Sequence, residues 1–158
     1  MSARIGTHQR ATSESDISVE INLDGPAAAD IATGLPFFDH MLTAFAVHGG
    51  FGLQVAARGD IAVDAHHTVE DTAIVLGEAF AKALGDKAGI TRFGQQQLPM
   101  DEALVEAVVD ISGRPYCVFR GEPEHLVHQI IGGHYATVMN EHFFFFFAKH
   151  AGLTLHVR

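Results

Sequence analysis

The sequence contains a group of histidine and acidic residues at spacings that favour metal binding. The group lies between Asp64 and Asp71 (DAHHTVED), where His66 and His67 precede Glu70 by four and three positions. On a helix, these spacings bring imidazole and carboxylate to one face. Neighbouring histidines point in different directions, so they would bind two different ions, and mixed imidazole and carboxylate ligation favours Mn, Fe or Zn over Ca or Mg. The alternative is an ordinary helix N-terminus with surface histidines.

Two more histidines, His40 and His142, each follow an acidic residue at the expected start of a helix. The carboxylate beside them, Asp39 in the first case, could orient the imidazole of a metal ligand. His48 and His150 lie two turns further along the same helices. We interpret these two as polar residues near a helix C-terminus, where the helix dipole favours a cation.

Two arginines lie in glycine-flanked turns, Arg92 in GITRFG and Arg114 in SGRP. A guanidinium in such a turn fits the recognition of a phosphate group by its planar set of donors. A solvated surface arginine is the alternative in either case. Glu14, in RATSES, has no spacing argument in its favour, and from the sequence alone it reads as a surface carboxylate.

Alternation of apolar and polar residues and helical periodicity predict the elements that position these side chains. The predicted helices cover residues 36–48, 68–84 and 140–150. The predicted strands cover residues 17–23, 52–57, 61–64, 104–110, 116–119 and 153–158, with a hairpin turn at 58–60 and a loop over 122–133.

The chain carries an internal repeat that predicts two similar halves, approximately 1–90 and 91–158. Residues 39–55 (DHMLTAFAVHGGFGLQV) match residues 141–157 (EHFFFFFAKHAGLTLHV) without gaps. By the same repeat, a counterpart of the histidine motif would lie roughly ten residues beyond Arg158. The last strand, without a hairpin partner, is expected to be an exposed sheet edge.

Composition narrows the possible classes of protein. The 158 residues suffice for a single domain. The formal charge of −9, with only 10 Lys and Arg, argues against nucleic-acid binding. No apolar run could span a membrane, and the single Cys117 suits a reducing cytoplasm. Nucleotide-binding and serine-hydrolase motifs are absent. The run Phe143–Phe147 is apolar around its whole helix, which predicts burial on several sides, by subunit packing or within the core.

Taken together, the segments resemble the imidazoleglycerol-phosphate dehydratases along nearly the whole chain. The matching pieces are RATSES, LPFFDHML, DAHHTVEDTAIVLGEA, GITRFG, PMDEAL, DISGRPY, EHFF and AGLTLHVR. The resemblance implies an α+β fold of two similar halves, each a mostly antiparallel four-stranded sheet with helices on one face. It also implies a cytoplasmic hydro-lyase of histidine biosynthesis, which converts imidazole glycerol phosphate to imidazole acetol phosphate. Such enzymes use two Mn²⁺ ions per site and assemble from trimers into 24-subunit shells.

The resemblance also implies roles for single residues. The metal ligands would be His40, His66, His67, Glu70 and His142. Arg92 and Arg114 would hold the substrate phosphate, and Glu14 would be the acid/base near the reacting carbons. The family's second HHxxE motif and its C-terminal loop with Ser and Lys would lie beyond Arg158, so the second half is expected to be incomplete and the chain not fully active.

The chemistry of this reaction explains the residue types. The carbon-bound proton has no carbonyl beside it, so the imidazole ring must serve as the electron reservoir, held as imidazolate by the two metals. Glu14 would move the proton, and the arginines would fix the phosphorylated chain. Two other readings stay open. One is a non-catalytic metal-binding or assembly form, and the other is a binuclear metal phosphohydrolase, which the lack of Asp-rich motifs disfavours.

Overall fold

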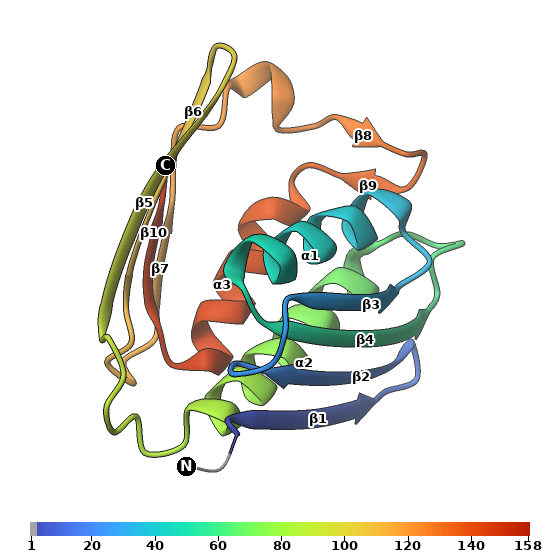
Figure 1. The fold of residues 1–158 in the computed structure, drawn as a ribbon. Helices are drawn as coiled ribbons and strands as arrows, with labels where there is room; N and C mark the ends of the chain where they lie inside the picture. Colours follow the sequence, from blue (N-terminus) through green and yellow to red (C-terminus); the bar gives the residue numbers. More distant parts are fainter. Residues whose placement is uncertain (1–2) are drawn as a thin grey trace.

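Two four-stranded sheets frame the molecule, with three α-helices packed between them, in a computed structural model that describes residues 3–158 (Figure 1). The first sheet and its helices are β1 (Ile5–Ala11), β2 (Ser15–Asn22), β3 (Ala28–Ala32), α1 (Pro36–Gly49), β4 (Gly52–Gly59) and α2 (His66–Leu84). The second part comprises β5 (Phe93–Met100), β6 (Ala103–Asp110), β7 (Tyr116–Phe119), the 3₁₀ turn η1 (Glu124–Leu126), β8 (Ile130–Ile131), β9 (Tyr135–Ala136), α3 (Met139–Ala151) and β10 (Thr154–Val157).

The two sheets share one topology. The first has the order β1-β2-β4-β3 and the second β5-β6-β10-β7, and β8 and β9 form a separate small ribbon. In each four-stranded sheet two pairs are antiparallel and one edge pair, β3–β4 or β7–β10, is parallel. The predicted α+β class, with similar halves and mostly antiparallel sheets, is confirmed. Within residues 3–158 the second half contributes one helix, α3, where the first contributes two.

The internal repeat corresponds to a repeated helix-to-strand connection. Gly50 after α1 has φ 75° and Gly152 after α3 has φ 68°, and each donates its N–H to the fourth residue before it, Ala46 or Ala148. This left-handed conformation favours glycine, because a Cβ would crowd the backbone. The two glycines therefore end the helices in the same way and direct the chain into β4 and β10. The division of the chain near residue 90 stays a prediction.

The predicted strand 61–64 and its hairpin turn at 58–60 are wrong. β4 continues through Gly59, and residues 61–64 form turns, with the Val63 N–H donating to Asp60 O at 2.7 Å. The reason is the sheet order, because β4 pairs with β2 on one side and β3 on the other and has no free edge for a hairpin partner. The turn instead brings Asp60 beside Glu14, whose carbonyl accepts the Asp60 N–H at 3.1 Å.

The predicted exposed edge at the last strand is also wrong. β10 lies between β6 and β7, and Leu155 and Val157 on it are buried. The exposed strand is β5, whose residues are all exposed and which the sequence patterns missed. Its sequence, FGQQQLPM, has no alternation of apolar and polar residues, so the period-two signal was absent.

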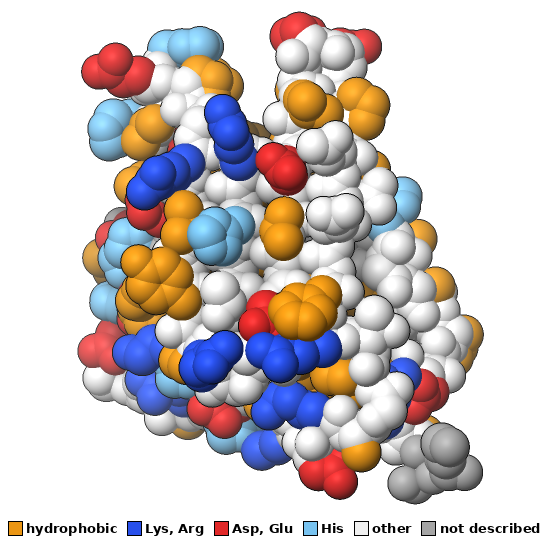
Figure 2. Space-filling model, turned by 90° about the vertical axis from the view of Figure 1, so that its left-hand side faces the viewer, with side chains coloured by type: hydrophobic (Ala, Val, Ile, Leu, Met, Phe, Trp, Pro, Cys, Tyr) orange, Lys and Arg blue, Asp and Glu red, His pale blue; other side chains and the backbone are white. Residues whose placement is uncertain are grey.

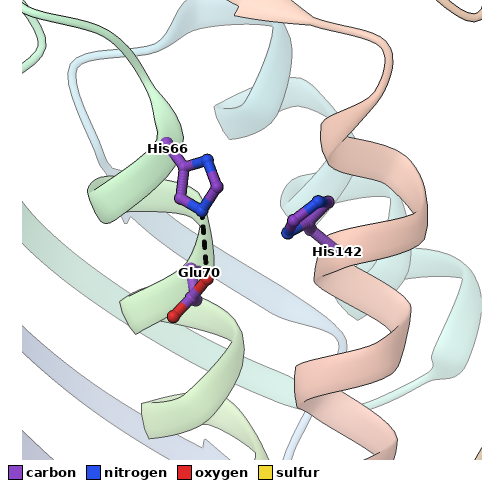
Figure 3. A group of neighbouring side chains, drawn as sticks. All are labelled: His66, Glu70 and His142. Carbon is purple, nitrogen blue, oxygen red and sulfur yellow. Dashed lines mark hydrogen bonds and ion pairs between the residues drawn. The ribbon is translucent and has the colours of Figure 1, made fainter.

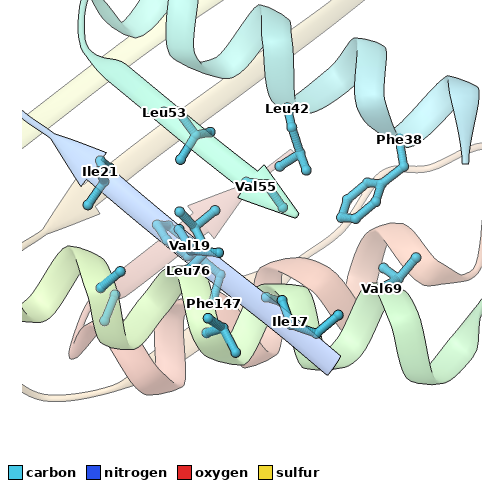
Figure 4. Packing of buried hydrophobic residues seen from close by; sticks show 14 of the residues in the cluster. Ile17, Val19, Ile21, Phe38, Leu42, Leu53, Val55, Val69, Leu76 and Phe147 are labelled. Carbon is cyan, nitrogen blue, oxygen red and sulfur yellow. The ribbon is translucent and has the colours of Figure 1, made fainter. Parts of the chain in front are cut away.

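The hydrophobic core joins both halves of the chain (Figure 4). Alternate residues of β2, which are Ile17, Val19 and Ile21, point to the buried face of the sheet, where Leu76 of α2 covers them. A fully buried side chain of this size contributes about 1.5–3 kcal/mol. The same cluster includes Phe147 of α3.

The phenylalanine-rich helix α3 belongs mainly to this core. Phe147 is 7% exposed, and Phe143, Phe144 and Phe146 are half-buried, whereas Phe145 is 48% exposed. Burial within the core is therefore confirmed for four of the five phenylalanines, and subunit packing of this helix stays a prediction. Between residues 3 and 158, no helix combines the length and the apolar character needed to cross a membrane.

Candidate metal centre

Three potential metal ligands meet where the first turns of α2 and α3 lie side by side. His66 and Glu70 come from α2 and His142 from α3 (Figure 3). His66 Nε2 lies 3.1 Å from Glu70 Oε2, and one ligand atom from each of the three residues lies within 4.8 Å of the others. The rings of His66 and His142 are 4.9 Å apart, centroid to centroid. The structure thus joins the histidine motif of the first half to a histidine of the second.

This donor set fits a transition-metal ion. At a metal–nitrogen distance of about 2.1 Å, neighbouring ligand atoms on one ion are about 3 Å apart, so the His66–Glu70 pair already has the required spacing. His142 would need only a small side-chain movement to join them. Two imidazoles and a carboxylate suit Mn, Fe or Zn better than Ca or Mg. All three side chains are partly exposed, which leaves room for a substrate or further ligands.

His67 faces a different direction from His66, as the sequence predicts for neighbouring histidines. Its Nδ1 lies 3.0 Å from Asp60 Oδ2, so the carboxylate orients the ring and leaves Nε2 free. The hydrogen bond to Asp60 raises the pKa of His67, and the charges of Asp60, Glu14 and Asp64 raise it further. A carboxylate on the second ring nitrogen is the usual support of a metal-binding histidine.

Glu14 lies in the turn between β1 and β2, close enough to His67 for their charges to interact. Ser13 Oγ donates to Glu14 Oε1 at 2.7 Å. This hydrogen bond lowers the pKa of Glu14, with smaller contributions from Thr12, the Glu14 backbone N–H and the charge of His67. The carboxylate is therefore ionised at neutral pH, as a proton acceptor must be.

His40 is exposed in the first turn of α1 and does not belong to the three-residue group. The expected support from Asp39 is not found. Asp39 Oδ1 instead accepts hydrogen bonds from Thr33 N at 2.9 Å and Thr33 Oγ1 at 2.5 Å. Asp39 therefore holds the connection from β3 to α1, and the role of His40 as a ligand stays a prediction.

The two predicted phosphate-binding arginines lie together around Asp110. Arg92 donates to both carboxylate oxygens of Asp110, at 2.6 and 3.0 Å, and its guanidinium lies 4.8 Å from the centre of the Phe93 ring. The hydrogen bonds from Arg92 lower the pKa of Asp110, and the charges of Arg92 and Arg114 contribute too. Figure 2 shows Lys and Arg side chains gathered towards the lower end of the outer face of the second sheet.

The arginine pair and the three metal-ligand candidates lie at opposite ends of α3. The turn before Arg114 contacts the C-terminal end of α3, where Gly113 N donates to Gly152 O at 2.9 Å. His142 lies in the first turn of the same helix. Ten residues of α-helix separate the two ends by about 15 Å. The backbone positions next to Arg114 and at His142 therefore lie far apart within one copy of the chain.

Three residues next to the candidate site were not singled out by the sequence patterns. Asp60 supports His67, and Ser15 and Asp71 form a buried hydrogen bond of 2.5 Å between β2 and α2. Asp71 directly follows Glu70 in the motif, and this second carboxylate was the available signal for a residue with a role other than metal ligation. Asp60 carried no signal, because its turn was assigned to a hairpin.

Comparison with known proteins identifies the family to which the chain belongs. A family model described as "Imidazoleglycerol-phosphate dehydratase" matches residues 33–158. The chain is 70% identical over 154 residues to an imidazoleglycerol-phosphate dehydratase of Corynebacterium glutamicum (strain R), covering 98% of this chain and 76% of that protein. It is 59% identical over 162 residues to one from Rhodococcus jostii (strain RHA1), covering 100% of this chain and 79% of the relative.

Solved structures agree with this comparison. The crystal structure of imidazoleglycerol-phosphate dehydratase from Staphylococcus aureus superposes with a TM-score of 0.82 at 36% identity, covering 97% of this chain and 82% of that one. A Pyrococcus furiosus structure, described as IGPD in complex with (S)-C348, superposes with a TM-score of 0.78, also at 36% identity, covering 96% and 78%. The chain thus spans about three quarters of the length of the curated relatives.

Proposed function

The chain belongs to the imidazoleglycerol-phosphate dehydratase family and is a hydro-lyase of histidine biosynthesis; we propose that it works through manganese held by His66, Glu70 and His142. The convergence of these three donors within 4.8 Å, from two helices, is the observation that carries the proposal. His67, with its Nε2 free, would be a ligand of the second ion, and His40 is a further candidate ligand.

The residues of the chain would divide the work of dehydration. Bound manganese would act as a Lewis acid on the imidazole ring of the substrate. Glu14, ionised and close to His67, can take up the carbon-bound proton, while the hydroxyl on the carbon next to the imidazole ring would leave as water; loss of both gives the enol, which then becomes the ketone. Asp60 keeps the His67 ring in one orientation. The position of Glu14 beside His67, and not the direction of its pKa shift, supports its role as the base.

The arginines support a site shared between copies of the chain. Arg92 and Arg114 would hold the substrate phosphate, and Asp110 pre-orients the guanidinium of Arg92. They lie about 15 Å along α3 from His142 in the same chain. A second copy would therefore supply the arginines to this metal centre. This geometry supports a homo-oligomer, and trimers assembled into a 24-subunit shell are the form that the family resemblance implies.

The remaining proposals concern the cellular location and the competing readings. A biosynthetic enzyme with a single cysteine, Cys117, suits the reducing cytoplasm. Release of inorganic phosphate from the substrate would support the phosphohydrolase reading, whereas a dehydratase keeps the phosphate in its product. Manganese binding without turnover would support the non-catalytic reading.

The test is a manganese titration of His142→Ala beside a matched control, His150→Ala. His150 lies two turns further along α3, pairs with Glu78 at 3.0 Å and is not one of the three candidate ligands. We expect His142→Ala to weaken Mn²⁺ binding at least about 10–100-fold, because that is the loss when only a residue supporting a ligand is removed, and His150→Ala to change it less than about twofold. Equal effects of the two variants on Mn²⁺ affinity would refute the proposed metal centre.

A further inference from the structure

Glu14 can serve the reaction only if its turn keeps a constant position relative to the metal-binding end of α2. The turn is exposed and connects two strands, β1 and β2, so its own hydrogen bonds do not define that position. Within it, Thr12 Oγ1 accepts the N–H groups of Glu14 and Ser15, at 3.2 and 3.0 Å. These bonds shape the turn but do not attach it to the helix.

Besides the apolar packing of β2 on α2, the turn has a polar attachment to the helix, which comes from Asp71. Asp71 is 7% exposed, and its carboxylate accepts hydrogen bonds from Ser15 Oγ at 2.5 Å and from Arg10 Nε at 3.0 Å. Ser15, itself 5% exposed, is the residue directly after Glu14, and Arg10 is near the end of β1. One carboxylate on α2 therefore holds both strands that flank the Glu14 turn.

The helix geometry links this contact to the metal centre. Asp71 follows Glu70 directly and lies one turn after His67, so it shares the face of His67, while His66 and Glu70 share the face towards α3. A second contact runs in parallel, because Asp60 donates its N–H to Glu14 O and places its carboxylate on His67. The first turns of α2 thus carry His66 and Glu70 on the side towards α3, and His67 together with the anchor of the Glu14 turn on a different side.

The burial of Asp71 indicates a specific requirement. Its neighbours Val69, Thr72 and Ala73 are buried, and an apolar residue at this position would be expected to pack well. A buried carboxylate is unfavourable unless it is paired and hydrogen-bonded. Both partners of Asp71 come from the strands around Glu14. We propose that Asp71 is a positioning residue, which acts through Ser15 and Arg10 to hold Glu14 at a constant distance from the metal-binding end of α2.

This inference rests on the proposed base role of Glu14, and a double-mutant cycle tests both separately. The variants are Ser15→Ala, Glu14→Gln and the double variant, measured as the full chain with saturating Mn²⁺. A misplacement of about 1 Å can cost up to about 100-fold in rate. We expect Ser15→Ala to lower kcat roughly 10–100-fold, with KM and Mn²⁺ affinity within about twofold, and Ser15→Thr to restore kcat. In the Glu14→Gln background, Ser15→Ala should cause no further loss.

The outcomes distinguish the two ideas. Full activity of Glu14→Gln would refute the proposed role of Glu14. An equal loss from Ser15→Ala in both backgrounds would leave that role intact and overturn the positioning role of Asp71. Thr72→Val is the matched control, because Thr72 is buried beside Asp71 and, among residues 3–158, its hydroxyl bonds only within α2, to Thr68 O at 2.7 Å. A loss of kcat in Thr72→Val as large as that in Ser15→Ala would also overturn the inference.

Amide hydrogen exchange tests the attachment of the Glu14 turn without measuring catalysis. The Asp60 N–H donates to Glu14 O, so its exchange with deuterium reports on the attachment of the turn. Arg10→Gln removes one of the two hydrogen bonds to Asp71 at a side chain that is 44% exposed, where folding is tolerant of change. We expect Arg10→Gln to raise the Asp60 exchange rate more than about threefold and Thr72→Val to leave it unchanged. Unchanged exchange in Arg10→Gln would contradict the attachment.

Discussion

The close approach of α2 and α3 brings the candidate ligands together, and Gly77→Ala is the substitution that probes it. A Cβ at Gly77 would lie 2.8 Å from His150 Cβ, 2.9 Å from Ala151 N and 2.9 Å from Phe147 O. Two of these three atoms belong to the backbone of α3, so they cannot rotate out of the way. The added methyl group must therefore push the two helices apart.

The size of the effect follows from two opposing contributions. Overpacking of a well-packed interface costs about 1–3 kcal/mol, and contacts with backbone atoms place this case in the upper part of the range. Alanine is favoured over glycine inside a helix by about 1 kcal/mol. The free energy of unfolding should therefore fall by about 1–2 kcal/mol. For a domain of this size, the melting temperature should fall by about 2–8 °C.

Thermal unfolding of the metal-free protein measures the first effect, and Ala81→Gly is the matched control. Ala81 lies on the partly exposed side of α2, where removing a Cβ should cost about 1 kcal/mol through helix propensity alone. The same Gly77→Ala protein should bind Mn²⁺ more weakly, because α2 carries His66 and α3 carries His142. A higher melting temperature of Gly77→Ala would refute the argument about helix spacing.

Three further tests, with four substitutions, probe the packing and the charges of the fold. The Thr68 hydroxyl is buried without a hydrogen-bond partner among residues 3–158, so Thr68→Val should stabilise the chain by about 1 kcal/mol in denaturant unfolding; destabilisation would point to a partner of this hydroxyl outside the described residues. Phe147→Ala should lower the free energy of unfolding by about 3–5 kcal/mol. Phe145→Ala, at a side chain 48% exposed, should change it by less than about 1 kcal/mol. Similar losses in denaturant unfolding of the two variants would contradict the assigned burial. Hydrogen bonds from Arg4 lower the pKa of Asp24 from 3.8 to about 2. The contribution of this pair is therefore present above pH 3.8 and lost as the pH falls to about 2, so the melting temperatures of the wild type and Asp24→Asn should converge over that range; a difference that persists at pH 2 would show another origin.

Local sequence patterns predicted the helices and strands whose own residues show a regular spacing of apolar side chains. The helix before Gly50, the helix over residues 68–84 and the β2 alternation were all visible, because each depends on a short period of apolar side chains. The spacing of His66 and Glu70 likewise predicted a shared helix face. Strands without such alternation, such as β1 and β5, were missed, and Pro36 and the helix-ending glycines helped only at helix boundaries.

Contacts between residues far apart in the sequence could be identified only from the tertiary structure. His142 meets His66 only because α2 and α3 pack closely at Gly77, and helix packing depends on shape complementarity that no local period contains. The order of the strands decides that residues 61–64 form turns and place Asp60 beside Glu14.

The sequence by itself thus determined the chemical types, the family resemblance and the repeat, since these depend on residue identity and spacing along the chain. Only the fold showed that Arg114 lies at the far end of α3 from His142 and that Asp71 holds the Glu14 turn. Distances between segments are set by how whole helices and sheets pack, and that packing is a property of the three-dimensional structure.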